Sequence, residues 1–141
     1  MANTIRPIQR DASMMQISSH RISWSPDARV WKGEFVGARH GVETTIIFTL
    51  LGSHQRGPEL HRHPYSETFV VRRGTVKFIL GEESLAAKAG DIVVVPAGSP
   101  HRFDNDGAEE LEMMDIHASG TFQTIWLDPV TQRPIERPAK Q

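Results

Sequence analysis

Residues 90–105 read Gly-Asp-Ile-Val-Val-Val-Pro-Ala-Gly-Ser-Pro-His-Arg-Phe-Asp-Asn, and this stretch decides the expected fold. The run Ile-Val-Val-Val predicts a strand, the strongest strand signal in the chain. Pro96 and Gly98 end that strand sharply and aim His101, which opens a short second strand, back toward the interior. Asn105 can cap the following turn with its own side chain. The stretch therefore predicts two strands whose connecting loop presents a histidine to the inside of a β-structure.

A second polar group precedes it at residues 61–67, His-Arg-His-Pro-Tyr-Ser-Glu. His61 and His63 are two residues apart, so in a strand their imidazoles project from the same face and can converge on one ion. Glu67 shares their parity, and a turn at the intervening proline would bring it onto the next strand beside them. A His-x-His pair alone most often means two solvated side chains. Together with His101, however, these residues make a three-histidine, one-carboxylate set that suits a divalent first-row ion.

Short strand-like segments separated by glycine and proline fill most of the remaining chain. They are expected at 30–36, 43–51, 59–63, 68–73, 75–80, 84–88, 110–117 and 121–127. No segment shows sustained helical periodicity, and many short strands at close spacing favour an all-β sandwich or barrel. The segment 43–51 is apolar on both faces, which favours cover on both sides, the second side by another subunit.

The chain has 141 residues, which fits a single domain over 1–141. We expect its barrel core at about 30–127, a loose N-terminal arm at 1–13 and an extended, proline-containing C-terminal tail at 128–141.

Composition excludes several classes of function. The net charge of −1 provides no basic field for nucleic acid or an anionic membrane. There is no cysteine, so any metal must be bound by histidine, carboxylate or water. The longest apolar stretch, 46–51, is far too short to span a bilayer, and the N-terminus lacks the apolar core of a signal peptide. We therefore expect a cytoplasmic protein with no nucleic-acid or membrane partner.

The two motifs together resemble those of the cupin superfamily, in its small, single-domain microbial form. Residues 61–67, followed by six residues and Gly74, resemble the first cupin motif. Residues 90–105 resemble the second and match at Gly90, Pro96, Gly98, His101 and Asn105, with fifteen residues between Gly74 and Gly90. One departure is Gln55, where the first motif often has a glycine that shapes a loop and binds no metal.

This resemblance implies a double-stranded β-helix, or jelly-roll barrel. It also implies that His61, His63, Glu67 and His101 are metal ligands, because all four family ligand positions match. A homodimer is a further implication, since small cupins commonly pair their sheets and exchange N-terminal strands. The implied cofactor is one divalent first-row transition metal per chain, with Fe, Mn, Ni, Zn and Cu all compatible with such a site.

Function is open below this level, because the fold hosts many unrelated activities. The first hypothesis is a metal-dependent enzyme on a small organic molecule, with dioxygenase-type chemistry ranked first and Glu67 as ligand and possible proton acceptor. Non-redox isomerase, cyclase or lyase chemistry comes next, with the metal as a Lewis acid. A non-catalytic module that binds a small ligand or stores metal is the alternative class. A metal-free sugar epimerase is disfavoured, because all four ligand positions hold competent residues.

Other polar residues give weaker signals. Asp115 and His117 share one face of segment 110–117, where they either face substrate as acid or base or lie at a water-exposed rim. His54 is either a lid residue or simply solvated. The remaining candidates are expected to have structural roles: Phe69, Val71 and Phe103 as barrel filling, Met113 and Met114 as core, and Arg72 and Arg73 at a solvated strand edge. A triad built on Ser66 or Ser99 lacks a strained nucleophile turn.

Overall fold

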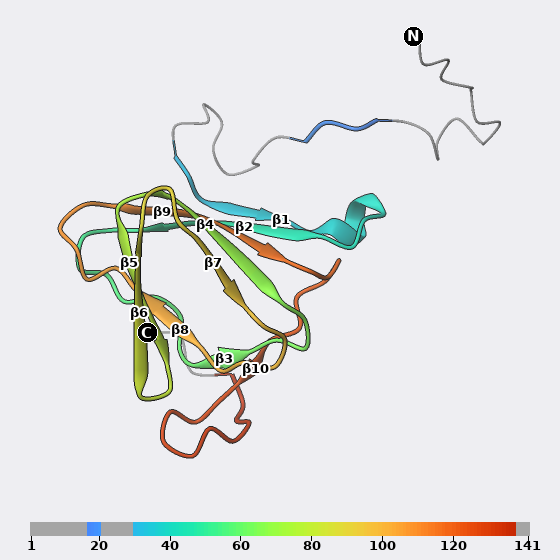
Figure 1. Ribbon diagram of the computed structural model, residues 1–141. Coiled ribbons are helices and arrows are strands. Elements are labelled where there is room, and N and C mark those ends of the chain that lie inside the picture. Colours follow the sequence, from blue (N-terminus) through green and yellow to red (C-terminus); the bar gives the residue numbers. More distant parts are fainter. Residues whose placement is uncertain (1–16, 21–29, 138–141) are drawn as a thin grey trace, which may run out of the picture.

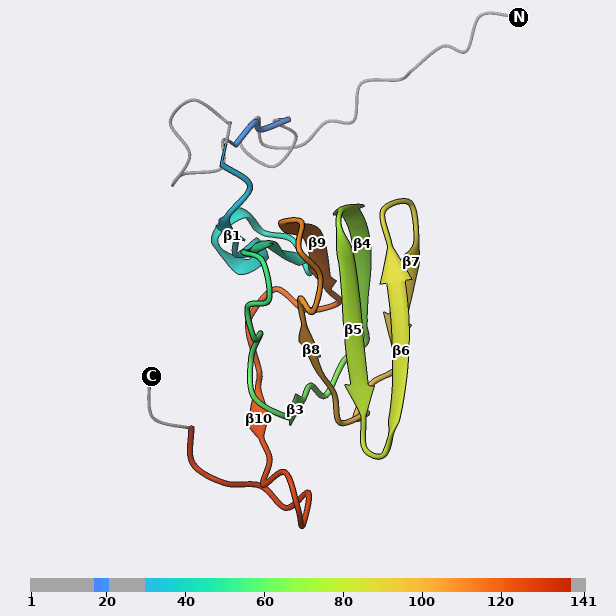
Figure 2. The same cartoon turned by 90° about the vertical axis from the view of Figure 1, so that its left-hand side faces the viewer.

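The computed structural model describes residues 17–20 and 30–137, so the expected N-terminal arm 1–13 lies outside the described residues. Two layers of antiparallel strands face each other and enclose the core (Figures 1 and 2). The larger sheet has the order β1-β2-β9-β4-β7, formed by β1 (Gly33–Phe35), β2 (Thr45–Leu51), β9 (Leu111–His117), β4 (Glu67–Arg73) and β7 (Ile92–Val95). The described residues contain no α-helix, and one 3-10 helix, η2 (Gly37–His40), connects β1 to β2.

Two smaller sheets form the opposite layer. One has the order β6-β5-β8, built from β6 (Glu83–Lys88), β5 (Thr75–Leu80) and β8 (Arg102–Asp104). The other pairs β10 (Ile125–Trp126) with β3 (His61–Arg62), and Figure 1 shows this pair at the lower end of the barrel. The arrangement confirms the expected all-β double-stranded β-helix.

The passage from the large sheet to the small one occurs at Gly74, between β4 and β5. Its φ is +82°, a left-handed conformation that glycine adopts without strain. A Cβ at this position would lie 2.4 Å from the carbonyl oxygen of Glu110, so the close approach also requires glycine. The turn lets consecutive strands belong to opposite layers, which is what closes the barrel.

Strand alternation sorts the side chains between core and surface. In β9 the residues at odd numbers are buried and those at even numbers are partly exposed. Phe69, Phe78 and Phe103 pack edge-on or tilted against one another at the centre of the barrel. The expected fillers Phe69, Val71 and Phe103 are all in this core, with exposures of 5% or less. Met113 is fully buried as expected, whereas Met114 is only half-buried.

The strands differ from expectation mainly at their ends. The first strand is shorter than 30–36, and the last, β10, covers only two residues of 121–127. The short helix η2 was not expected, because its four residues are too few to show a periodic pattern. It depends on Gly37, where a Cβ would lie 2.0 Å from the carbonyl oxygen of Thr44.

The expectation of an extended tail is wrong for its described part. The Asp128 carboxylate accepts hydrogen bonds from the backbone N–H groups of Val130 and Thr131. The turn that it caps folds the chain back, so that the N–H of Ile135 donates to the carbonyl oxygen of Trp126.

Among the described residues, no helix is long and apolar enough to cross a membrane.

Candidate metal centre

The candidate ligands reach the same end of the barrel from three separate segments. His61 lies on β3, His63 in the turn that follows, and Glu67 at the first position of β4. His101 precedes β8 and pairs with His61 through two backbone hydrogen bonds, N to O distances 3.1 and 2.9 Å. The N–H of Gly98 donates to the carbonyl oxygen of His63 at 2.7 Å, which fixes the second motif's loop against the first.

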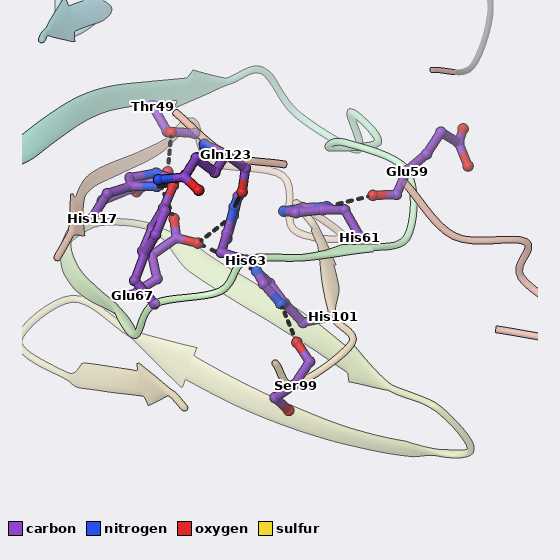
Figure 3. Close-up of polar contacts among 11 residues, drawn as sticks. Thr49, Glu59, His61, His63, Glu67, Ser99, His101, His117 and Gln123 are labelled. Carbon is purple, nitrogen blue, oxygen red and sulfur yellow. Dashed lines mark hydrogen bonds and ion pairs between the residues drawn. The ribbon is translucent and has the colours of Figure 1, made fainter. Parts of the chain in front are cut away.

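The four expected ligands meet at one point inside the protein. One ligand atom from each of His61, His63, Glu67 and His101 lies within 4.8 Å of all the others. The Nε2 atoms of His63 and His101 are 3.1 and 3.3 Å from Oε1 of Glu67. All four side chains are buried, and Figure 3 shows the imidazoles converging near the carboxylate.

In each of the three imidazoles, the Nδ1 atom contacts a backbone carbonyl oxygen, and this contact orients the ring. Nδ1 of His61 contacts the Glu59 carbonyl oxygen at 2.6 Å, and Nδ1 of His101 contacts that of Ser99 at 2.9 Å. Nδ1 of His63 lies 3.0 Å from the carbonyl oxygen of Gln123. A carbonyl oxygen only accepts, so Nδ1 carries the proton in each ring. In the neutral imidazole, Nε2 then carries a lone pair directed at the centre.

This arrangement fits a cation. Neutral Nε2 lone pairs and a carboxylate oxygen at 3.1–3.3 Å repel one another unless a positive charge lies between them. The buried Nε2 of His63 also has no hydrogen-bond partner among the described residues. Three nitrogen donors and one oxygen donor form a set that divalent first-row ions accept.

The electrostatics of the site favour a neutral His61 and an ionised Glu67. Burial first, and then the neighbouring His101, lower the pKa of His61 to about 4. Burial alone would raise the pKa of Glu67, but hydrogen bonds from His101, His117 and His63, which form when these rings carry a proton on Nε2, outweigh burial and hold that pKa below its usual range. A cation at the centre would take the place of those protons. A neutral imidazole and an ionised carboxylate are the protonation states that metal ligands require.

A fourth histidine adjoins the group. His117 on β9 pairs in register with Glu67, and its Nε2 lies 3.1 Å from Oε2 of that carboxylate. Its Nδ1 contacts the hydroxyl of Tyr65 at 2.7 Å. His117 is only 2% exposed, and Asp115 only 3%, so the expectation of a water-exposed rim is wrong for both. Sequence reasoning gave no role to Tyr65, although it lies within the first motif.

A cavity of about 370 Å³ opens beside the histidines, within the range of small-molecule sites. Its walls are largely apolar. His61, His63, Glu67, Asp115 and His117 contribute polar groups to it, and Arg56 and Thr124 also line it. The apolar part of the lining includes Ile47, Leu51, Pro58, Phe103, Phe122 and Trp126.

The histidine, arginine and serine candidates outside the group lie away from this cavity. His54 is exposed. The Arg72 guanidinium lies 4.1 Å from the ring centroid of Trp31, and Arg73 pairs with Glu109 and Glu110. The carbonyl oxygen of Ser99 orients His101, and neither Ser99 nor Ser66 lines the cavity.

Comparisons with known proteins agree with this fold. A protein with a double-stranded β-helix domain from Klebsiella pneumoniae is 17% identical, has a TM-score of 0.58, and is matched over 84% of this chain and 96% of its own. An oxalate decarboxylase mutant from Bacillus subtilis is 19% identical with a TM-score of 0.59. That match covers 67% of this chain but only 27% of the decarboxylase. A cupin superfamily protein from Desulfitobacterium hafniense is 13% identical, with a TM-score of 0.50 and coverage of 55% and 68%.

These structural likenesses show a shared fold. No curated protein matches the sequence. The profile of the cupin domain family matches residues 47–117, half of the chain, and this range includes both motifs and all four converging side chains. The chain therefore belongs to the cupin domain family.

Proposed function

We propose that this cupin is a metal-dependent enzyme that acts on a small organic molecule, with His61, His63, Glu67 and His101 as the ligands of one divalent transition metal. The observation that carries the proposal is the orientation of the three imidazoles, whose Nδ1 atoms all meet backbone carbonyl oxygens. Three neutral imidazoles and one carboxylate would leave a dication with one net positive charge. A substrate oxygen that enters the cavity would meet that charge.

Dioxygenase-type chemistry is the first candidate reaction. A redox-active metal, when bound, would relay electrons from the substrate, which is oxidised, to dioxygen, which is reduced. The chain's own contribution is a largely apolar cavity, lined by Phe122 and Trp126 among others. Oε1 of Glu67 faces His63 and His101, while Oε2 lies beside His117 and is placed to accept a proton from the substrate.

A non-redox isomerase, cyclase or lyase is the second candidate, and Asp115 favours it. Burial raises the pKa of this carboxyl well above its usual range, and the charge of Glu67 raises it further. A carboxyl that stays protonated inside a cavity can donate a proton to a substrate. The Bacillus subtilis oxalate decarboxylase, which shares the fold at 19% identity, has Mn(II) centres. That likeness supports a metal and carries over no substrate.

The first test is elemental analysis of untagged protein purified without chelator, together with His101→Ala. We expect about one Fe, Mn, Ni, Zn or Cu per chain in the wild type and loss of most of it in the variant. His101 contributes one of four donors, so its loss should remove metal and leave the circular dichroism spectrum of the fold. The exposed His54 provides the matched control, and His54→Ala should keep the metal. Normal metal content in His101→Ala would refute the ligand assignment.

The reaction class is then tested with an oxygen electrode. Consumption of oxygen with a catechol, a flavonol or a thiol, lost in His101→Ala, would support the dioxygenase. A metal-loaded protein that changes carbonyl substrates without oxygen uptake would support the non-redox enzyme. A chain that binds no metal after incubation with Fe(II), Mn(II) and Zn(II) would instead be a ligand-binding barrel.

A further inference from the structure

One buried polar group in the cavity is used neither by the fold nor by the metal site. Asp115 lies on β9 at the centre of the five-stranded sheet, in register with Ile47 on one side and Phe69 on the other. Its side chain points inward between Met113 and His117, and it is 3% exposed. It does not belong to the group of four converging ligands.

Only one of the two oxygens of this carboxyl group has a hydrogen-bond partner among the described residues. Oδ2 accepts a hydrogen bond from the Thr49 hydroxyl at 2.6 Å. Oδ1 is buried and has no hydrogen-bond partner among the described residues. A buried polar atom left without a partner destabilises the fold, so an inward strand position would ordinarily hold an apolar residue. Asp115 lines the cavity, so a molecule bound there can supply the missing partner.

The surroundings of Asp115 favour a neutral partner. Of the described residues that line the cavity, Arg56 alone carries a fixed positive charge, and Glu59 neutralises it at 3.1 Å. Glu67 adds a negative charge to the same cavity. The net positive charge of a bound metal would be met by the metal-binding oxygens of the substrate, so an anionic group next to Asp115 would have no counter-charge of its own, whereas an uncharged oxygen would need none. The raised pKa of Asp115, caused first by burial and then by Glu67, agrees with a carboxyl that donates its proton in a hydrogen bond.

We propose that Asp115 is a substrate-binding residue whose free Oδ1 hydrogen-bonds an uncharged oxygen of the substrate. The substrate class is then a small, apolar-bodied molecule that carries metal-binding oxygens at one end and a carbonyl or hydroxyl oxygen at the other. Thr49 orients the carboxyl, and the apolar side chains Ile47, Leu51 and Phe122 contact the substrate body. This assignment rests on the proposed function, in which the metal binds the oxygens at one end of the substrate. Asp115 binds the uncharged oxygen at the other end.

Two variants separate a binding role from a structural one. Asp115→Asn keeps a group that accepts from Thr49 and donates into the cavity. The double variant Thr49→Val/Asp115→Leu removes both the donor and the acceptor of this hydrogen bond, so no buried polar atom is left unpaired. The probes are catechol, which has only its two metal-binding oxygens, and 2,3- and 3,4-dihydroxybenzaldehyde, which add an uncharged carbonyl at different positions. The charged analogue of the latter is 3,4-dihydroxybenzoate.

Binding is measured by calorimetry on protein whose metal content has been determined. We expect the wild type to bind one of the aldehydes about tenfold more tightly than catechol, and more tightly than the benzoate. The double variant should lose that tenfold preference for the aldehyde over catechol, while Asp115→Asn should keep it within a few fold. Equal binding of catechol and both aldehydes by metal-loaded wild type, or an unchanged preference in the double variant, would overturn the assignment.

If the wild type binds no metal, the proposed function fails. A measurement on metal-free protein still tests the role of Asp115 in that case. Thermal unfolding of the metal-free proteins should show the double variant melting a few degrees above the wild type, because it lacks the unpaired buried oxygen. A purely structural Asp115 predicts the reverse, a clear fall in melting temperature. That fall would refute the substrate-binding role whatever the metal content.

Discussion

The four histidines of the site share one hydrogen-bonding arrangement, in which Nδ1 contacts an oxygen atom and Nε2 points toward the centre of the site. Three of the oxygens are backbone carbonyls, and the fourth, the Tyr65 hydroxyl, serves His117. Backbone carbonyls depend on the fold alone and cannot be removed by side-chain substitution. Ring orientation at His61, His63 and His101 is therefore fixed without a metal, which would limit the reorganisation that binding of the proposed metal requires.

His61 makes the stability of the metal-free protein depend on pH. Its pKa is lowered from 6.5 to about 4, so between these values the unfolded chain binds a proton that the folded chain does not. The free energy of unfolding should therefore fall as the pH drops from 6.5 toward 4. The lowered pKa of His61 accounts for up to about 3 kcal/mol of this fall. Urea unfolding of metal-free protein at pH 7.5 and pH 5 measures the loss.

The variant His61→Gln should show a smaller loss between these two pH values, because it lacks the group that must stay neutral on folding. His54→Gln is the matched control, since that side chain is exposed, and it should lose as much stability as the wild type. An identical pH dependence in His61→Gln and the wild type would contradict the role given to His61.

Among the connections between strands, the loop after β8 depends on one side chain. Asn105 is 1% exposed, and its Nδ2 donates toward the carbonyl oxygens of Leu51, Gly52 and Glu109 at 3.2, 2.8 and 2.9 Å. Its Oδ1 accepts from the N–H of Gly107. One amide thus joins the end of β2, its own turn and the approach to β9, which carries Asp115 and His117.

Removing this amide should destabilise the barrel. Asn105→Ala leaves several buried backbone groups without partners, and we expect a loss of about 3 kcal/mol in the free energy of unfolding. Chemical denaturation measures it. Asp106→Ala, at the exposed neighbouring position, is the control and should change stability by less than about 0.5 kcal/mol. A loss of similar size in both variants would mean that the amide has no special part in the turn.

Sequence reasoning reached those parts of the site that depend on local pattern. The parity of His61 and His63 is a local feature that placed these two imidazoles on one face, and the glycine-containing loop directed His101 inward. Their meeting with Glu67 as one ligand set was an implication of the family resemblance. Parity also placed Asp115 and His117 on one face, but their burial depends on which strands cover that face, and alternation along one strand does not contain this information. The carbonyl acceptors were likewise beyond reach, because backbone oxygens such as that of Gln123 carry no residue-specific signal.

The assembled barrel leaves an apolar outer face on its five-stranded sheet. Registers place its outward side chains in two neighbouring rows across the strands: Ile46, Ile116, Thr68 and Val94 in one, Phe48, Met114, Val70 and Ile92 in the other. Trp31 covers part of this face, packing edge-on against Phe48. At the other end, on β7, Ile92 and Val94 are 64% and 62% exposed. Apolar side chains gathered on one sheet face are typical of an interface.

We expect two chains to pair through this face, because a second copy would bury the exposed side chains of β7 against a surface of the same kind. Light scattering after size exclusion should give twice the mass of one chain. Val94→Lys should give monomers, since a lysine there would be buried without a partner. Val130→Lys introduces the same charge at a position that is 89% exposed in the C-terminal turn, and it should stay dimeric. A monomeric wild type at tens of micromolar, or a dimeric Val94→Lys, would assign this face to something other than self-association.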